Sequence, residues 1–486
     1  MKQSRKRLAG KHKRTLKRGN KKKMRGGLFV IDWRTNPWDA VLEMMGCNGA
    51  TLSVISYGSL YGFILLLTIP EGSECANFKD ENGNLVYKIV LKIVLLDDNK
   101  KRFILPDFMD SKKSTMTRSN FSNEALKQER VFKEYISTEE APFKKRHTGM
   151  SIKPITLGVA CNEVFDKTNY ETAFLSLLSQ VHRDNIVEDV NRVIEYIRTS
   201  MQGVTGLGVI AMNYAGNYIT DNTNYQMITL SQALKVSLDD IGYTTNTTTK
   251  KRKIDDYSIL DSNLNDAKNK CCEYSIAQML IMLLVFKSIN TDAHKSNFLT
   301  IFYKQVPMVP SLENITTWMI DMGRLTDVKN ISNEFNYNYQ QYSSQYKTYY
   351  KNGPTFQYMC NIVLTTDISK LFDGAYIEEN ILRALHDFTT FITVIDCIVN
   401  NHTDKIPQCA FVIEYLVGSD NIDDMIHFSN WTNLYKNKAL LAKYKRILEY
   451  MHFITTESAK YPGVDYSSNW YINMNRYNSP AFSNDF

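Results

Sequence analysis

The most constraining feature of this 486-residue sequence is a helical segment that has no polar face. Residues 267–289 have the composition of a long helix, and their run Ala277–Phe286 (AQMLIMLLVF) is apolar nearly all round. Such a helix has to be enclosed by other elements, because exposed apolar faces are unfavourable in water. The sequence therefore predicts a central buried helix, which follows a polar surface insertion at residues 244–253 (TTNTTTKKRK).

The segments on either side of this helix differ in kind. Before it, β-prone runs dominate, and Leu85–Leu96 (LVYKIVLKIVLL) has the pattern of a strand buried on most sides. Ser122 is the expected N-cap of the one early helix. Strands first and helices later indicate an α+β protein with two lobes. We expect strands at 85–96, 209–214, 298–303 and 316–320, and helices at 122–136, 170–201, 378–400 and 433–455.

Charge is distributed unevenly along the chain. Residues 1–27 hold 13 Lys and Arg and no acid, whereas the remainder holds 45 basic and 51 acidic residues, so the total of +7 conceals a body of −6. The first 27 residues are too polar and too alike in charge to fold. They predict a disordered basic tail that binds nucleic acid or another acidic surface, or serves as a nuclear address.

The eight cysteines are scattered, and none forms a C-x-x-C pair. This spacing excludes a zinc framework and a small disulfide scaffold. We expect reduced thiols in an intracellular protein, in the cytoplasm, the nucleus or a virion.

The longest uncharged stretch, Met44–Pro70, does not predict a membrane span. Its dense apolar part is the nine-residue run Gly62–Pro70 (GFILLLTIP), and a spanning helix needs about 20 mainly apolar residues. Two strands joined by a glycine-containing turn suit this composition better.

The candidate chemistry comes directly after the buried helix. The stretch NTDAHKSNFL contains Asp292-x-His294-x-x-Asn297, and the second strand after it ends in Asp321-Met322-Gly323. A carboxylate such as Asp292 can accept a hydroxyl proton, and Asn297 and Asp321 offer the hard oxygen ligands that Mg²⁺ prefers. A hairpin of the two strands would bring the second acid back beside the first, and Gly323 would let the chain turn sharply there.

This order and spacing resemble the protein-kinase-like superfamily, whose catalytic loop is H-R-D-x-x-x-x-N and whose metal loop is D-F-G. The Asp-x-His-x-x-Asn form is similar to that of aminoglycoside and choline kinases and of divergent kinase-like proteins of large DNA viruses. Asn290 and Thr291 stand in place of the usual His and Arg, and Met322 in place of Phe.

The resemblance covers roughly residues 28–400 and implies a two-lobed protein-kinase-like fold with insertions. It has a small β-rich N-lobe and a mainly helical C-lobe. The implied segments are a disordered basic tail (1–27), the N-lobe (28–214), the C-lobe (215–458) and a C-terminal extension (459–486).

The resemblance also implies where MgATP would bind. Lys92, in Ile89-Val90-Leu91-Lys92, takes the place of the lysine that pairs with the α- and β-phosphates, with Lys88 on the same strand face as its rival. A buried lysine needs an acidic partner, because an unpaired buried charge is costly. Glu124 on the following helix is the first choice and Glu129 the second.

Two further segments correspond to parts of a nucleotide site. Gly58 and Gly62, in SYGSLYG, would allow a phosphate-covering loop to approach closely, although a plain turn fits equally well. Met212-Asn213-Tyr214 resembles the hinge whose backbone meets adenine, which implicates Met212 and Tyr214.

A second register exists in the sequence. His182-Arg183-Asp184 is the usual triplet itself, and Asp240-Ile241-Gly242 could serve as its metal loop. Asp189 stands where that register needs Asn, and the hinge-like strand would then be out of order. We therefore prefer the register of Asp292.

The resemblance implies an ATP-dependent phosphotransferase that moves the γ-phosphoryl group of MgATP to a hydroxyl, with a protein Ser or Thr as the expected acceptor. Asp292 would orient the acceptor, and His294 could contact the transferring phosphate. The poor glycine loop and the lack of an A-P-E motif keep a pseudokinase or scaffold open, and the basic tail keeps open a nucleic-acid-binding structural protein. The kinase-like interpretation requires Lys92 and Asp321 to lie side by side.

Overall fold

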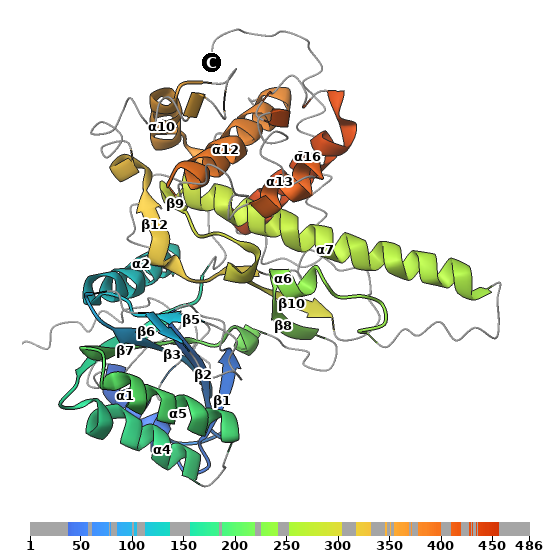
Figure 1. Cartoon of the computed structure of the whole chain (residues 1–486). Coiled ribbons are helices and arrows are strands. Elements are labelled where there is room, and N and C mark those ends of the chain that lie inside the picture. Colours follow the sequence, from blue (N-terminus) through green and yellow to red (C-terminus); the bar gives the residue numbers. More distant parts are fainter. Residues whose placement is uncertain are drawn as a thin grey trace, which may run out of the picture.

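The computed structural model shows an N-terminal sheet region followed by a mostly helical region (Figure 1). The predicted basic tail, Gly58 and the predicted C-terminal extension lie outside the described residues. The structure describes residues 37–56, 61–76, 78, 85–99, 102–104, 112–136, 156–183, 187–218, 225–241, 252–303, 317–331, 346–347, 350, 354–368, 371, 378–399, 410–418, 427–428, 430, 434 and 436–455.

The N-terminal region is built on one five-stranded antiparallel sheet with the order β1-β2-β3-β7-β6. The predictions of a strand within 85–96, a strand near 209–214 and two strands within 44–70 are confirmed. β3 lies at the centre and pairs with β2 and β7 along its whole length, which explains its continuous apolar sequence. The strands are β1 (Thr51–Ser56), β2 (Gly62–Thr68), β3 (Lys88–Leu96), β6 (Val159–Asp166) and β7 (Gly206–Asn213).

Helices cover both faces of this sheet (Figure 1). On one face, Ile89 and Leu91 of β3 pack in a core with the three helices α1, α4 and α5. On the other face, Val90 and Val94 pack against α2. Because side chains alternate along a strand, Lys92 points to the α2 side. The helices are α1 (Pro37–Met45), α2 (Arg118–Ile136), α4 (Ser176–Arg183), which continues a π-helical turn at Glu171–Leu175, and α5 (Glu188–Met201).

Two helix predictions in this region need correction. α2 begins at Arg118, and Thr117 caps it by accepting from the Asn120 amide at 3.1 Å, so Ser122 is not its N-cap. α1 was not expected at all, because its nine residues are too few for a clear helical period in a stretch of turn-forming residues.

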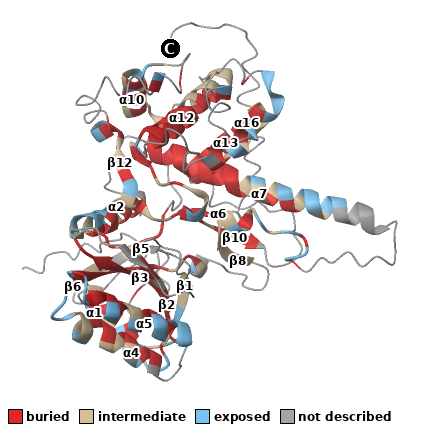
Figure 2. Cartoon of the chain, in the orientation of Figure 1, coloured by how far each residue is buried: buried red, intermediate tan, exposed pale blue. Residues whose placement is uncertain are grey.

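The C-terminal region is organised around α7 (Arg252–Leu284), and the prediction of a central buried helix is confirmed. Figure 2 shows this helix red where the other helices surround it and exposed where it projects beyond them. It begins at Arg252, inside the predicted surface insertion, whereas the prediction started the helix at residue 267, so the polar N-terminal part of α7 was not predicted. The surrounding helices are α10 (Phe356–Thr365), α12 (Glu378–Val399), α13 (Ala410–Val417) and α16 (Lys438–Thr455).

Short strands between α7 and these helices hold the segments with candidate chemistry. The predicted strands near 298–303 and 316–320 form an antiparallel pair in which Phe298 lies opposite Met319. A second pair places Leu325 opposite Asn290. The three-stranded sheet contains β8 (Tyr225–Thr229), β10 (Phe298–Tyr303) and β11 (Thr317–Met319), and the two-stranded sheets contain β9 (Ser288–Asn290) with β12 (Leu325–Asp327) and β4 (Arg102–Ile104) with β5 (Lys112–Ser114).

Cys47 and Cys75 form a disulfide across 28 residues, so the expectation of reduced thiols is wrong for this pair. The end of α1 and the turn after β2 bring the two cysteines together, and no local motif announces such a contact. Within the described chain, none of the helices combines the length and the apolar character that a membrane span requires.

Candidate functional site

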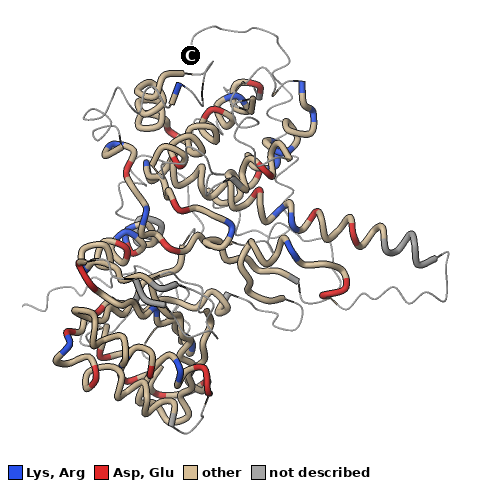
Figure 3. The backbone as a smooth tube through the Cα atoms, in the orientation of Figure 1, with Lys and Arg blue, Asp and Glu red and all other residues tan. Residues whose placement is uncertain are grey.

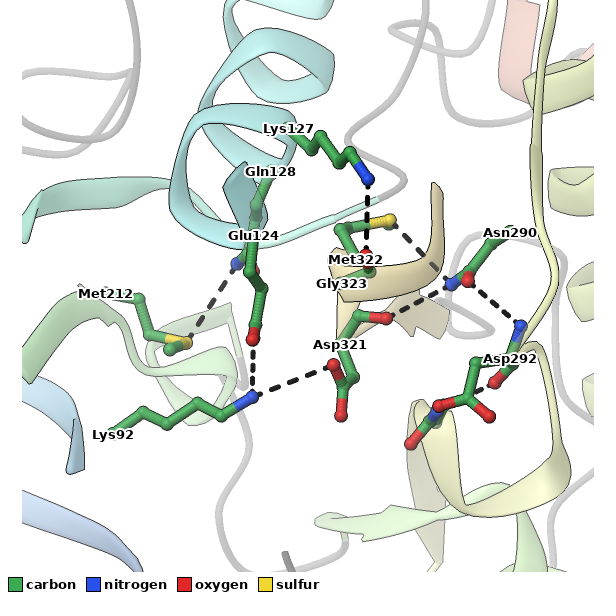
Figure 4. Close-up of polar contacts among 11 residues, drawn as sticks. Lys92, Glu124, Lys127, Gln128, Met212, Asn290, Asp292, Asp321, Met322 and Gly323 are labelled. Carbon is green, nitrogen blue, oxygen red and sulfur yellow. Dashed lines mark hydrogen bonds and ion pairs between the residues drawn. The ribbon is translucent and has the colours of Figure 1, made fainter. Parts of the chain in front are cut away.

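Lys92, Glu124 and Asp321 meet at the junction of the two regions (Figure 4). The Lys92 ammonium donates to Glu124 Oε1 at 2.5 Å, and its Nζ lies 3.7 Å from Asp321 Oδ1. Lys92 comes from the central strand β3, Glu124 from α2 and Asp321 from the turn after β11. Lys92 and Glu124 are buried, whereas Asp321 keeps about a third of its side chain exposed.

The electrostatics of this cluster favour a charged lysine. Burial opposes the charge of Lys92, but Asp321 and Glu124 outweigh it and raise the pKa of the ammonium above its ordinary value. Burial raises the pKa of Glu124 against the attraction of Lys92. Lys92 therefore pairs with two carboxylates, and the charge of Lys127 also acts on Glu124.

The turn at Asp321 has an unusual backbone. Asp321 has φ 60° and ψ 71°, in the left-handed region that non-glycine residues rarely adopt. The sequence suggested that the chain turns sharply at Gly323. In the structure the left-handed backbone conformation falls on Asp321 instead. Strained dihedrals of this kind persist where the surroundings enforce them, often at functional sites. Here the Asp321 carbonyl accepts a hydrogen bond from Asn290 Nδ2 at 3.2 Å.

Asp292 and Asn297 belong to one compact segment after β9. Asn297 Nδ2 donates to the backbone oxygen of Asp292 at 2.7 Å and reaches its carboxylate Oδ2 at 3.5 Å. His294 accepts from the Ser296 amide through Nδ1 at 3.2 Å, which fixes its ring on a short 3₁₀ turn (Lys295–Asn297). The segment thus holds the acid, the amide and the imidazole in one defined arrangement.

Asn290 links this segment to the turn at Asp321. Its side-chain nitrogen donates to the Asp321 carbonyl, and its side-chain oxygen accepts from the Asp292 amide at 3.1 Å. In the sequence Asn290 was noted only as the replacement of a usual histidine. The sequence offered one signal for this role, an amide residue at the end of a short strand. The bond to the Asp292 amide is local, whereas the bond to the Asp321 carbonyl follows only from the fold.

The pKa of Asp292 is raised above its ordinary value. Burial is the main cause, the charge of Arg324 opposes it, and repulsion from Asp321 adds to it. A carboxylate with a raised pKa is a stronger base, which suits a group that takes up a hydroxyl proton.

The donor set fits Mg²⁺ bound together with a phosphate. Because its amide nitrogen is directed at Asp292, Asn297 presents its amide oxygen elsewhere, and Asp321 adds a carboxylate. Among the described residues, no three His, Cys, Asp or Glu side chains gather into a metal cage. Mg²⁺ commonly takes only one or two protein oxygens and completes its shell with phosphate and water.

The three described residues that the resemblance assigned to a nucleotide, Met212, Tyr214 and Gly62, have different surroundings. Met212, near the end of β7, receives a hydrogen bond from Gln128 of α2 at 4.0 Å, on the face of the sheet that carries Lys92. Tyr214 follows β7 and is half-buried. Gly62 starts β2, and a Cβ there would lie 1.8 Å from the Ile93 carbonyl oxygen. Strand packing alone therefore requires glycine at 62.

An apolar cluster beside the site was not foreseen. It joins the residue after Tyr214 to the three-stranded sheet, and several of its members are only partly buried. Ile320 directly precedes Asp321, and Leu299 lies two residues after Asn297, so the cluster adjoins the polar groups. Its buried members are Leu157, Ala215 and Trp318, and its partly buried members are Met227, Leu299, Ile301 and Ile320.

Of the second register, the two residues with described contacts, His182 and Asp240, lie in different regions of the structure. His182 ends α4, in the helical layer on the opposite face of the sheet from α2, where its Nε2 accepts from the Val187 amide at the start of α5 at 3.0 Å. Asp240 accepts from Ser237 in the segment before α7. Asp184 and Gly242 lie outside the described residues.

No protein-family model matches this chain, and a search of curated proteins finds no similar sequence.

Proposed function

We propose that the protein is an ATP-dependent phosphotransferase of the protein-kinase-like type. The contact of Lys92 with both Glu124 and Asp321 carries this proposal, since it joins three segments that the sequence pattern named independently. The sheet with α2 on one face corresponds to the N-lobe, and the helices around α7 correspond to the C-lobe.

In the proposed phosphoryl transfer, each residue of the site has a separate role. Lys92, fixed by Glu124, would bind the α- and β-phosphates. Asn297 and Asp321 would hold Mg²⁺, which when bound neutralises charge on the phosphates. Asp292 orients the acceptor hydroxyl and takes up its proton. Catalysis then rests mainly on positioning and on charge stabilisation.

The adenine base is assigned to the apolar cluster and the segment around Met212 and Tyr214. Partly buried side chains such as Leu299 and Ile320 offer an apolar surface next to Asp321. A flat aromatic base gains from covering such a surface, and its polar edge can bond to the backbone after β7.

We propose a protein Ser or Thr hydroxyl as the acceptor. Asp292 is only half-buried, so an exposed protein segment can reach it from the surface. His294, on the same segment, would contact the transferring phosphate in this proposal.

The test is Mg²⁺-dependent ATP turnover and thermal stabilisation by MgATP. Asp292→Asn is expected to lower turnover by about 10²- to 10⁴-fold with nucleotide binding retained, whereas Lys92→Ala is expected to weaken both. Asp240→Asn, from the rejected register, is the matched control and should behave as wild type. Wild-type turnover at the background level, with no stabilisation by MgATP, would refute the proposal.

MgATP binding without turnover would instead support the second candidate, a pseudokinase or scaffold. The observation that favours it is the replacement of the usual His-Arg pair by Asn290 and Thr291. Asn290 nevertheless makes hydrogen bonds to both catalytic segments, which favours activity.

A further inference from the structure

The position of α2 decides whether the site is assembled. Glu124 lies on this helix, and Lys92 lies on the sheet, so a small rotation of α2 would separate them. Phe121 and Ala125 pack α2 firmly on the sheet. Toward the C-terminal region, Val131 is the one residue among the described side chains of α2 that belongs to the large helical core. Among these described side chains, the apolar attachment on this side is therefore slight.

Polar contacts supply the rest of the attachment. Arg130 of α2 forms a two-pronged ion pair with Asp327, with Nη2–Oδ1 at 2.8 Å and Nη1–Oδ2 at 3.3 Å. Arg130 Nη2 also donates to Ser288 Oγ at 3.2 Å. One turn earlier, Lys127 Nζ donates to the Gly323 carbonyl at 3.2 Å (Figure 4).

The acceptors of these bonds are held rigidly. Asp327 and Ser288 lie opposite each other in the β9–β12 pair, and the Ser288 hydroxyl lies 2.7 Å from Asp327 Oδ1. Burial alone would raise the pKa of Asp327, but hydrogen bonds from Arg130 and Ser288 lower it below its ordinary value, so the carboxylate stays charged. Of these two strands, β9 ends at Asn290, and β12 follows the turn at Asp321.

We infer that Arg130 and Asp327 are positioning residues whose ion pair docks α2 on the segment after Asp321, so that Glu124 is held where it meets Lys92. The catalytic consequence rests on the proposed phosphotransferase function, whereas the docking of α2 does not. A bidentate ion pair between an arginine and a carboxylate fixes the orientation of the two groups as well as their distance, and positioning α2 requires both.

The experiment compares Arg130→Gln, Asp327→Asn, the double variant and the charge swap Arg130→Asp with Asp327→Arg. The matched control is Arg118→Gln, on the same helix, because Arg118 pairs with Asp166 inside the N-terminal region and is as exposed as Arg130, 41% against 40%. Two quantities are measured: ATP turnover, as kcat and KM for ATP, and hydrogen exchange of the α2 amides.

Each single variant is expected to lower kcat about two- to fivefold, the range for a partly exposed ion pair, and to speed exchange in α2 but not in α12. The double variant should be no worse than either single one, the charge swap should recover part of the loss, and Arg118→Gln should leave kcat unchanged. Wild-type kcat and wild-type α2 exchange in Arg130→Gln would overturn the inference. If the wild type has no turnover, the proposed function fails, and the exchange data alone still confirm or overturn the docking.

Discussion

At the scale of single residues, the balance of charge around Asp292 sets the pH at which it would act as the base of the proposed reaction. Burial raises its pKa, and Arg324, which follows Gly323, opposes that rise. Asp292 must be deprotonated to accept a proton. The acid limb of kcat/KM should therefore lie above pH 4, near which an ordinary aspartate titrates.

Replacing Arg324 by Gln tests this balance. The substitution removes a positive charge that favours the ionised form of Asp292, so the pKa rises further and the acid limb moves to higher pH. The pH profile of kcat/KM for Arg324→Gln is compared with that of Arg192→Gln, an exposed arginine on α5. An unchanged acid limb in Arg324→Gln would show that another group controls it.

Asn290 connects the segment that carries Asp292 to the turn at Asp321. Asn290→Ala removes both its bond to the Asp321 carbonyl and its bond to the Asp292 amide. Loss of buried partners costs about 1–3 kcal/mol of unfolding free energy, and turnover should fall because the two segments of the proposed site are no longer tied. Chemical denaturation and ATP turnover measure the two effects. Asn330→Ala, at an exposed position, is the control, and equal behaviour of the two variants would contradict this role.

The sequence named Lys92, Glu124, Asp292, Asn297 and Asp321, and the structure shows contacts among them, but the sequence could not name the residues that hold them there. Asp292, Asn297 and Asp321 are separated by spacings that a helix, a loop and a hairpin translate directly into proximity. Asn290, through its bond to the Asp321 carbonyl, and the pair Arg130–Asp327 act between segments that only the folded chain brings together. Their residue types are common on protein surfaces, and so no local pattern distinguishes them.

At the scale of elements, the same division applies. β3 and the buried part of α7 were predictable, because burial on all sides leaves a continuous apolar run. The N-terminal part of α7 was not, because it projects beyond the core and its sequence is polar and rich in Asn and Asp. α1 is short and gains its stability from packing on β6 and α4, which a local pattern does not record.

The disulfide Cys47–Cys75 ties α1 to the turn after β2, at the edge of the N-terminal region. A cross-link over 28 residues contributes about 2–4 kcal/mol by restricting the unfolded chain. Reduction with dithiothreitol should therefore lower the melting temperature of the wild type. In the double variant Cys47→Ser with Cys75→Ser, the melting temperature should be low from the start and insensitive to the reductant. A wild type that does not respond to reductant would contradict a stabilising cross-link.

At the scale of the whole molecule, the described body and the first 27 residues have opposite charge. Lys and Arg are interspersed with Asp and Glu along the described chain (Figure 3). The 13 basic residues of the tail therefore form a separate source of attraction for an anionic partner, and the residues of the proposed catalytic site are all outside it. Binding through the tail and phosphoryl transfer should be separable.

Deleting residues 1–27 tests that separation. The deletion changes the net charge from +7 to −6. Affinity for a single-stranded oligonucleotide should therefore fall at least about tenfold at low salt, because Lys and Arg that bind phosphates displace condensed counterions into solution, and the truncated chain lacks these groups. Fluorescence anisotropy at several salt concentrations measures the affinity, and wild-type binding should weaken steeply with salt.

A variant with the same 27 residues in scrambled order is the matched control and should bind as wild type. ATP turnover should remain unchanged in both variants, and full binding by the truncated chain would place the nucleic-acid surface in the body.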